Sequence, residues 1–192
     1  YAELTYGGSH VSAASFPALK DRVVLVSGFS KAFAMTGWRI GYVAAPGEIL
    51  QAILKIHQYT VICAPSFSQH AALAALREGR EDGVARGSDM GAGYDKPRKF
   101  LYQSFLAAGL TVFEPKGAFY IFPSVRSTGL TGEEFAERLL LEERVAVVPG
   151  GAFGESGVYH IRCSYAASMQ NLIAAADRIA AFVRRVARER QK

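Results

Sequence analysis

The sequence predicts an α/β protein: the end of a larger α/β domain, residues 1–80, followed by a small α+β domain, residues 81–192. Two β-branched, apolar runs come first, at 23–27 and 38–45, and helical patterns follow them. Further along, helical patterns alternate with pairs of strand-like runs, which is typical of helices laid over one sheet. The 192 residues suffice for one ordinary domain, or for a small domain plus part of another.

The first half of the chain should contain two strands and then two helices. The runs VVLVS (23–27) and WRIGYVAA (38–45) carry few charges, so we expect buried strands of a parallel or mixed sheet. Apolar residues recur at helical spacing in EILQAILKIHQYT (48–60), which predicts an amphipathic helix. The alanine-rich segment 66–77 predicts a second helix, because alanine is the best helix former.

The middle of the chain, residues 77–100, is the least regular region. Each glycine weakens a helix there by up to about 1 kcal/mol. These glycines are Gly79, Gly83, Gly87, Gly91 and Gly93. Asp95 followed by Pro97 is a suitable helix start, and Gly109 is a suitable end.

Four strand-like runs and two helices complete the pattern. The runs are 110–115, 118–124, 145–150 and 158–166. Thr131 and Glu134 have the spacing of a capping box for a helix over 132–143. Ser168 should cap a long final helix, since the residues after it form one apolar stripe. That stripe is Leu172, Ala176, Ile179, Val183 and Val186.

The composition argues against several classes of function. The net charge of +5 comes largely from the tail 182–192, which we interpret as the solvated end of a helix. No interleaving of aromatic and basic residues indicates nucleic-acid binding, and no uncharged run of about 18 apolar residues indicates a membrane span. Cys63 and Cys163 are far apart, which favours a reducing cytoplasm over a disulfide. The four histidines are scattered, so no metal site is expected.

The stretch SGFSKAFAMTGWRIGY (27–42) places a charged lysine, Lys31, between two strand-like runs. A charge at that position requires an explanation. The amine of Lys31 becomes nucleophilic where burial or a neighbouring cation frees its lone pair. Arg39 could be that cation and could bind a phosphate bidentately, while Ser27 and Ser30 add hydroxyl groups. Such a set suits pyridoxal 5′-phosphate (PLP), a phosphorylated aldehyde held as a Schiff base. The alternative is a surface lysine beside a structural arginine.

This same stretch resembles the PLP attachment motif of class I/II aminotransferases, which are fold-type I PLP enzymes. The motif is Ser-Lys and then Gly-x-Arg-x-Gly, matched here by residues 30–31 and 37–41. The resemblance implies that Lys31 carries the cofactor and that Arg39 binds its phosphate. Many family members have a phosphate-binding serine three residues before the lysine, where this chain has Gly28. Ser30, ahead of Ser27, is therefore the expected hydroxyl near the phosphate.

The resemblance extends to both ends of the chain. YAELTY resembles the sequence that follows the family's Asp-x-x-Tyr signature, which implies that Tyr1 hydrogen-bonds the phenolic oxygen of PLP. The segments 115–124 and 145–166 resemble later family segments, and Arg162 would bind the α-carboxylate of the substrate. A strand arginine paired to a surface carboxylate is the alternative. Tyr120 could line the site, although a place in the core is the favoured interpretation.

The resemblance implies an aminotransferase that moves an amino group between an L-amino acid, such as aspartate or an aromatic residue, and a 2-oxo acid. It implies PLP as cofactor and a homodimer as the assembly. It covers only the C-terminal half of such an enzyme, so we expect a longer parent protein. The alternatives are a fold-type I lyase or synthase, and the non-catalytic aminotransferase-like domain of a transcription regulator.

Overall fold

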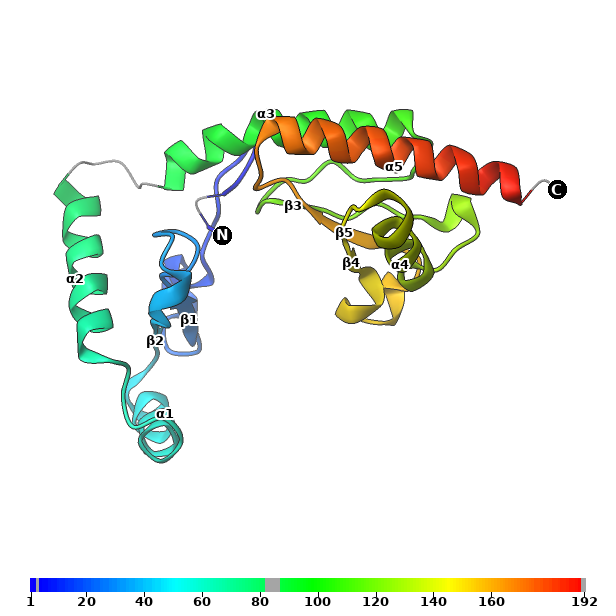
Figure 1. The fold of residues 1–192 in the computed structure, drawn as a ribbon. Helices are drawn as coiled ribbons and strands as arrows, with labels where there is room; N and C mark the ends of the chain where they lie inside the picture. The colour runs from blue at the N-terminus through cyan, green and yellow to red at the C-terminus, as the bar shows by residue number, and fades with distance from the viewer. Residues whose placement is uncertain (3, 82–86, 191–192) are drawn as a thin grey trace. The chain divides into compact units, whose positions relative to one another are not determined.

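The chain divides into two compact units, which are described separately below. The structure is a computed structural model that describes residues 1–2, 4–81 and 87–190. The units are Tyr1–Gly91 and Ala92–Lys192 (Figure 1). The predicted domain boundary, between residues 80 and 81, falls inside the first unit; the assignment of the two parts to a large and a small domain remains a prediction.

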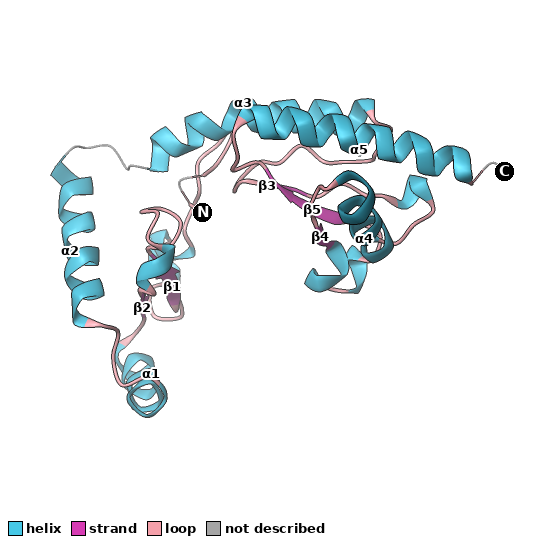
Figure 2. Cartoon of the chain, viewed as in Figure 1, coloured by secondary structure: helices cyan, strands magenta, loops and turns pink. Residues whose placement is uncertain are grey.

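The described residues of the first unit form one pair of strands and two long helices. Strand β1 (Leu25–Gly28) pairs with β2 (Gly41–Ala44) in antiparallel fashion. The helices are α1 (Gly47–Thr60) and α2 (Ser66–Glu81), close to the predicted bounds (Figure 2). Short 3-10 helices lie at Ala13–Ser15 (η1), Pro17–Leu19 (η2) and Thr36–Trp38 (η3).

The two strands of this unit are exposed, so the prediction that they are buried is wrong for this chain. Val26 in β1 is 73% exposed and Tyr42 in β2 is 47% exposed. The apolar residues of α1 are uncovered as well, with Ile56 67% exposed. Among the described residues β1 and β2 form a two-stranded sheet. Apolar strands are buried only where further strands or helices cover both faces, and these residues supply no such cover.

Helix α3 (Gly87–Ala107) begins earlier than the sequence predicts and holds Pro97 in its interior. Pro97 is buried, as are Leu101 and Phe105 further along the helix. At Pro97, burial of this face outweighs the poor helix propensity of proline, since tertiary packing supplies most helix stability. Gly83, one of the glycines counted against a helix, lies outside the described residues.

Helix α3 ends just before Gly109, as the sequence predicts. Gly109 has a φ of +82°, which favours glycine. Its N–H donates to Leu106 O at 3.0 Å, and the N–H of Leu110 donates to Phe105 O at 3.0 Å. These two bonds form a Schellman motif and end the helix.

The second unit is built on a three-stranded antiparallel sheet. Its strands are β3 (Tyr120–Ile121), β4 (Val148–Pro149) and β5 (Ile161–Ser164), in the order β3-β5-β4. The predicted strand at 110–115 is wrong, since it forms only the isolated bridge Thr111–Ser124. Arg98 binds Glu114 and the carbonyl of Pro115, which directs this segment toward α3 rather than along the sheet.

Two capped helices complete the second unit. Helix α4 (Gly132–Glu143) has the predicted capping box of Thr131 and Glu134. Helix α5 (Met169–Glu189) starts at Ser168, whose hydroxyl accepts from the N–H of Asn171 at 3.2 Å, and it packs against α4. The predicted stripe of α5 is buried, and the remaining 3-10 helices are η4 (Arg126–Thr128), η5 (Gly150–Phe153) and η6 (Glu155–Gly157). Residues 191–192 of the basic tail lie outside the described residues.

Candidate functional site

The connection between β1 and β2, residues 29–40, carries Lys31 and is anchored by its own backbone. Phe29 N donates to Ile40 O at 3.3 Å, while Phe29 O accepts from Phe33 N and Met35 N. The side chains of Phe29 and Met35 are buried with Ala72 of α2. The apolar residues on both sides of Lys31 thus fix the loop and leave the lysine half-buried.

Lys31 and Tyr1 lie close together although the chain separates them widely. The Nζ of Lys31 is 5.8 Å from the centroid of the Tyr1 ring, within the range of a cation–π contact. Both were predicted to surround the same cofactor, and the structure brings these two predicted residues together.

Arg39 and Ser30 are connected through Thr36. The Nη1 of Arg39 donates to Thr36 O at 2.9 Å, and the Thr36 hydroxyl donates to Ser30 O at 2.9 Å. Arg39 has a φ of +51°, so its backbone is held in the left-handed region at the end of η3. Among the described residues no carboxylate forms an ion pair with Arg39, and most of its N–H groups remain available for an anion.

Gly41 permits the close approach of β1 and β2. A Cβ built on Gly41 would lie 2.9 Å from Ser27 O, a distance that real Cβ atoms do not show. At Gly28 the nearest atom would be 3.5 Å away, which is ordinary contact. The close packing of the strands therefore requires a glycine at position 41 but not at position 28.

Ser68 supports the same loop, although no pattern in the sequence points to this role. Its side chain is fully buried, and its hydroxyl donates to Trp38 O at 2.8 Å. In the sequence Ser68 is one of several small polar residues at the start of a helix. Only the packing of α2 against the loop reveals that it holds the residue before Arg39.

Arg162 lies on β5, the central strand of the second sheet. Burial alternates along this strand: Ile161 and Cys163 face the core, while Arg162 points to the other face. The Cζ of Arg162 is 4.5 Å from the Tyr120 ring centroid and 4.4 Å from that of Phe153. Tyr120 is half-buried against Arg162, so its interpretation as a core residue misses this contact. Phe153 was not predicted.

Arg162 has no acidic partner within the part of the chain that the structure describes. The carboxylates that form ion pairs there bind other cations, such as Arg98, Arg138 and Arg185. The alternative interpretation, a strand arginine held by a surface carboxylate, is therefore not favoured by this geometry.

Cys163 is a buried neighbour of Arg162 rather than a reactive thiol. Burial raises the pKa of Cys163 to about 12, so the thiol stays protonated near neutrality. Both cysteines are free thiols. The described residues include no group of three His, Cys, Asp or Glu side chains able to hold a metal ion, and no described helix is long and apolar enough to cross a membrane.

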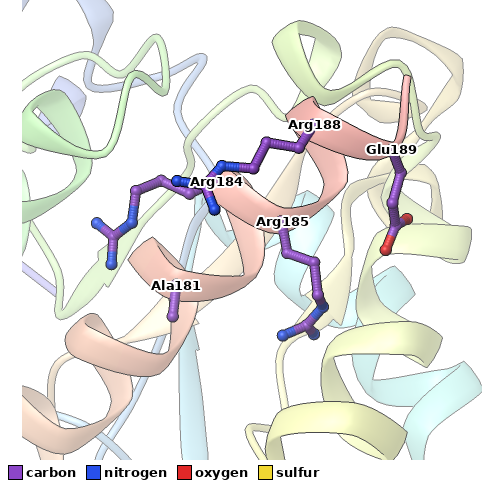
Figure 3. A pocket seen from close by; sticks show the side chains of 5 residues that line it. All are labelled: Ala181, Arg184, Arg185, Arg188 and Glu189. Carbon is purple, nitrogen blue, oxygen red and sulfur yellow. The ribbon is translucent and has the colours of Figure 1, made fainter. Parts of the chain in front are cut away.

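A hollow of about 390 Å³ on α5 lies apart from the predicted residues (Figure 3). Its lining is Ala181, Arg184, Arg185, Arg188 and Glu189. All these residues belong to one helix, and Arg185 already pairs with Glu142 and Glu143 at 2.7 Å. We interpret this surface as the solvated, basic end of α5.

The donor set of the first unit fits the predicted cofactor. PLP needs an amine for its aldehyde, a cation and a hydroxyl for its phosphate, and a donor for its phenolic oxygen. Lys31, Arg39, Ser30 and Tyr1 are of these types and belong to one unit. The structure places Lys31 beside Tyr1, and it joins Arg39 to Ser30 through Thr36.

Comparison with known proteins identifies a single family. The family model "Aminotransferase class I and II" matches residues 1–179. An aspartate aminotransferase of Pyrococcus abyssi is 45% identical over 175 residues, covering 91% of this chain and 44% of that protein. An aromatic-amino-acid aminotransferase of Thermococcus litoralis is 39% identical over 180 residues, covering 93% of this chain and 46% of that protein.

Solved structures agree with this result. The crystal structure of an aromatic aminotransferase from Pyrococcus horikoshii has a TM-score of 0.89 at 42% identity, covering 96% of this chain and 49% of that chain. Aspartate aminotransferase from Thermus thermophilus, solved with maleate, has a TM-score of 0.86 at 36% identity, covering 97% of this chain and 46% of that chain. The chain thus has the α/β fold of these enzymes and spans less than half the length of the relatives it matches.

Proposed function

The chain belongs to the class I and II aminotransferases, and on that premise we propose that its parent protein is a PLP-dependent aminotransferase. It would move an amino group between an L-amino acid and a 2-oxo acid. The observation that carries the proposal is the contact of Lys31 with Tyr1, because the family resemblance assigns both to the cofactor. The relatives are named as aminotransferases, which does not favour a lyase, a synthase or a regulator.

Four residues of the first unit would hold the cofactor. Lys31 would bind it covalently through Nζ, and Tyr1 would donate to its phenolic oxygen. Arg39 would offer a planar fork of N–H donors to the phosphate, with the Ser30 hydroxyl beside it. The bond from Arg39 to Thr36 O uses one of these donors and orients the others. When bound, PLP supplies the electron sink that stabilises negative charge at the substrate Cα.

The protein's own residues bind the substrate and move its proton. Arg162 would hold the α-carboxylate and so fix the position of Cα. Lys31, once displaced by the substrate amine, would take the proton from Cα with its Nζ and return it during the transfer.

The substrates and the assembly are further parts of the proposal. Relatives are named for aspartate and for aromatic amino acids, which supports a substrate of one of these kinds. We also propose a homodimer, by analogy with the family. The two free cysteines support a reducing compartment, the cytoplasm.

The test uses the full-length protein and two variants. The wild type should show the visible absorbance band of lysine-bound PLP and should transaminate 2-oxoglutarate with an amino donor. Lys31→Ala should lose both. Lys20→Ala, which changes an exposed lysine of the same unit, should keep both. Retention of the band and the activity in Lys31→Ala would show that the assignment is wrong.

A further inference from the structure

The guanidinium of Arg162 is held by aromatic rings instead of by an anion. Its Cζ lies 4.5 Å from the Tyr120 centroid and 4.4 Å from the Phe153 centroid. These two residues, the aromatic pair, come from different segments: Tyr120 from β3 and Phe153 from η5. Among the described residues, no hydrogen bond or ion pair engages the Arg162 guanidinium.

Ring contacts restrain an arginine without using its hydrogen-bond donors. The guanidinium is planar, and its five N–H groups point outward in that plane. An aromatic ring interacts with the face of this plane, so the N–H rim stays open for a carboxylate. A restrained fork also loses less conformational entropy on binding than a mobile one. Rings therefore prepare an arginine for a carboxylate better than an ion pair would.

Each ring of the aromatic pair has its own support. Tyr120 pairs with Ser164 in the ladder, and the residues just before it are held by Tyr165, which donates to Ala118 O and Phe119 O at 3.0 Å each. The Phe153 ring makes an edge-to-face contact with the Phe122 ring, with 6.2 Å between the ring centroids. Phe122 in turn stacks on His160 at 5.0 Å, with the ring planes only 4° apart.

We propose that Tyr120 and Phe153 are positioning residues that orient Arg162 for the substrate carboxylate. This inference rests on the proposed function, in which Arg162 binds that carboxylate. The aromatic pair touches the arginine and acts through it. Its loss should therefore weaken substrate binding and leave the chemical step nearly intact.

The principal variant is Phe153→Leu, because Phe153 is 52% exposed and the change should be tolerated by the fold. In the full-length protein we expect KM for the amino donor to rise about fivefold, with kcat within about twofold of the wild type; fivefold corresponds to about 1 kcal/mol, the strength of one such contact. Tyr120→Leu should behave in the same way. Tyr120→Phe keeps the ring and should keep the wild-type KM. Phe113→Leu is the matched control, since Phe113 lies in the same unit and is 89% exposed.

A second measurement observes the arginine itself. The Nε–H signal of Arg162 in a ¹⁵N spectrum, assigned by its loss in Arg162→Lys, should be displaced by ring currents. Phe153→Leu and Tyr120→Leu should each return it toward the ordinary arginine position. This readout needs neither cofactor nor turnover.

The outcomes separate this inference from the proposed function. If Arg162→Ala leaves KM unchanged, the role of Arg162 in substrate binding is wrong. If Arg162→Ala raises KM strongly while Phe153→Leu and Tyr120→Leu both match Phe113→Leu in KM and leave the Nε–H signal in place, the positioning role alone is overturned.

Discussion

The Nζ of Lys31 lies 5.8 Å from the ring centroid of Tyr1, so the first residue of the chain meets the loop between β1 and β2. The two residues are thirty positions apart, and no local pattern requires their contact. Yet both carry groups that a PLP site needs, an amine and a phenol. Because the two residues are close, the contribution of the Tyr1 hydroxyl can be tested separately from that of Lys31.

Tyr1→Phe tests the hydroxyl while it keeps the ring beside Lys31. A hydrogen bond to a charged oxygen contributes about 1.5–3 kcal/mol, so we expect kcat to fall between about tenfold and a hundredfold. The band of bound PLP should persist but shift, because the phenolic oxygen loses a donor. Absorbance spectra and steady-state kinetics of the full-length protein measure both effects. Tyr102→Phe, in α3, is the control; a Tyr1→Phe enzyme with the same spectrum and kcat as this control would refute the role of the hydroxyl.

Gly41→Ala tests the close approach of the two strands. The added Cβ would meet Ser27 O at 2.9 Å, and this neighbour is backbone that cannot move without opening the β1–β2 ladder. Overpacking of this kind costs about 1–3 kcal/mol of unfolding free energy. Gly37→Ala is the matched control, since nothing lies within 4 Å of its Cβ position. Urea unfolding should show a lower midpoint for Gly41→Ala only, and equal midpoints would contradict the geometry.

Helix ends could be predicted from the sequence because each depends on a few neighbouring residues. Thr131 with Glu134, Ser168, and Gly109 all act through hydrogen bonds within one turn of the helix. The motif at 30–41 was equally local, since Lys31 and Arg39 share one loop. Local chemistry of this kind can be read without knowing what else packs nearby.

Features that depend on distant segments could not be predicted. The burial of β1 and β2 depends on what covers them, and the β-branched run gives no information on that. The interior position of Pro97 is decided by packing of α3, which outweighs propensity. Phe153 contacts Arg162 only because η5 folds back toward β5, and no spacing in the sequence signals that return.

Arg98→Met tests the anchor of the segment that leads to the sheet. Hydrogen bonds from Lys99 and Arg98 lower the pKa of Asp95, and hydrogen bonds from Lys116 and Arg98 lower the pKa of Glu114. A carboxyl group whose pKa is lowered by folding stabilises the native state above its unfolded pKa, about 4. That stabilisation is lost as the pH falls through the lowered native values. Stability of the wild type should therefore fall on acidification below about pH 4–5.

The variant should depend less on pH, since both carboxyl groups have lost one cationic partner. Denaturant midpoints measured between pH 7 and pH 2.5 give the comparison. Lys96→Met removes an exposed cation from the same helix and should keep the full wild-type dependence. Identical pH profiles for Arg98→Met and Lys96→Met would show that Arg98 does not set the native carboxyl pKa values.

Tyr165→Phe tests whether a buried hydroxyl holds the backbone ahead of Tyr120. Tyr165 is fully buried, and its hydroxyl donates at 3.0 Å to the carbonyl of Ala118, a residue with a φ of +58°. A non-glycine residue in that conformation is strained and needs support from its surroundings. Loss of the bond should lower the unfolding free energy by about 1 kcal/mol.

The same change should relax the segment that carries Tyr120 toward Arg162. We expect a rise of about twofold to threefold in KM for the amino donor in the full-length protein, with kcat unchanged. Tyr159→Phe is the matched control, because Tyr159 contacts Arg126 through its ring, at 3.9 Å, and no described bond uses its hydroxyl. If Tyr165→Phe lowers stability but leaves KM equal to that of Tyr159→Phe, the hydroxyl supports the fold alone and does not position Tyr120.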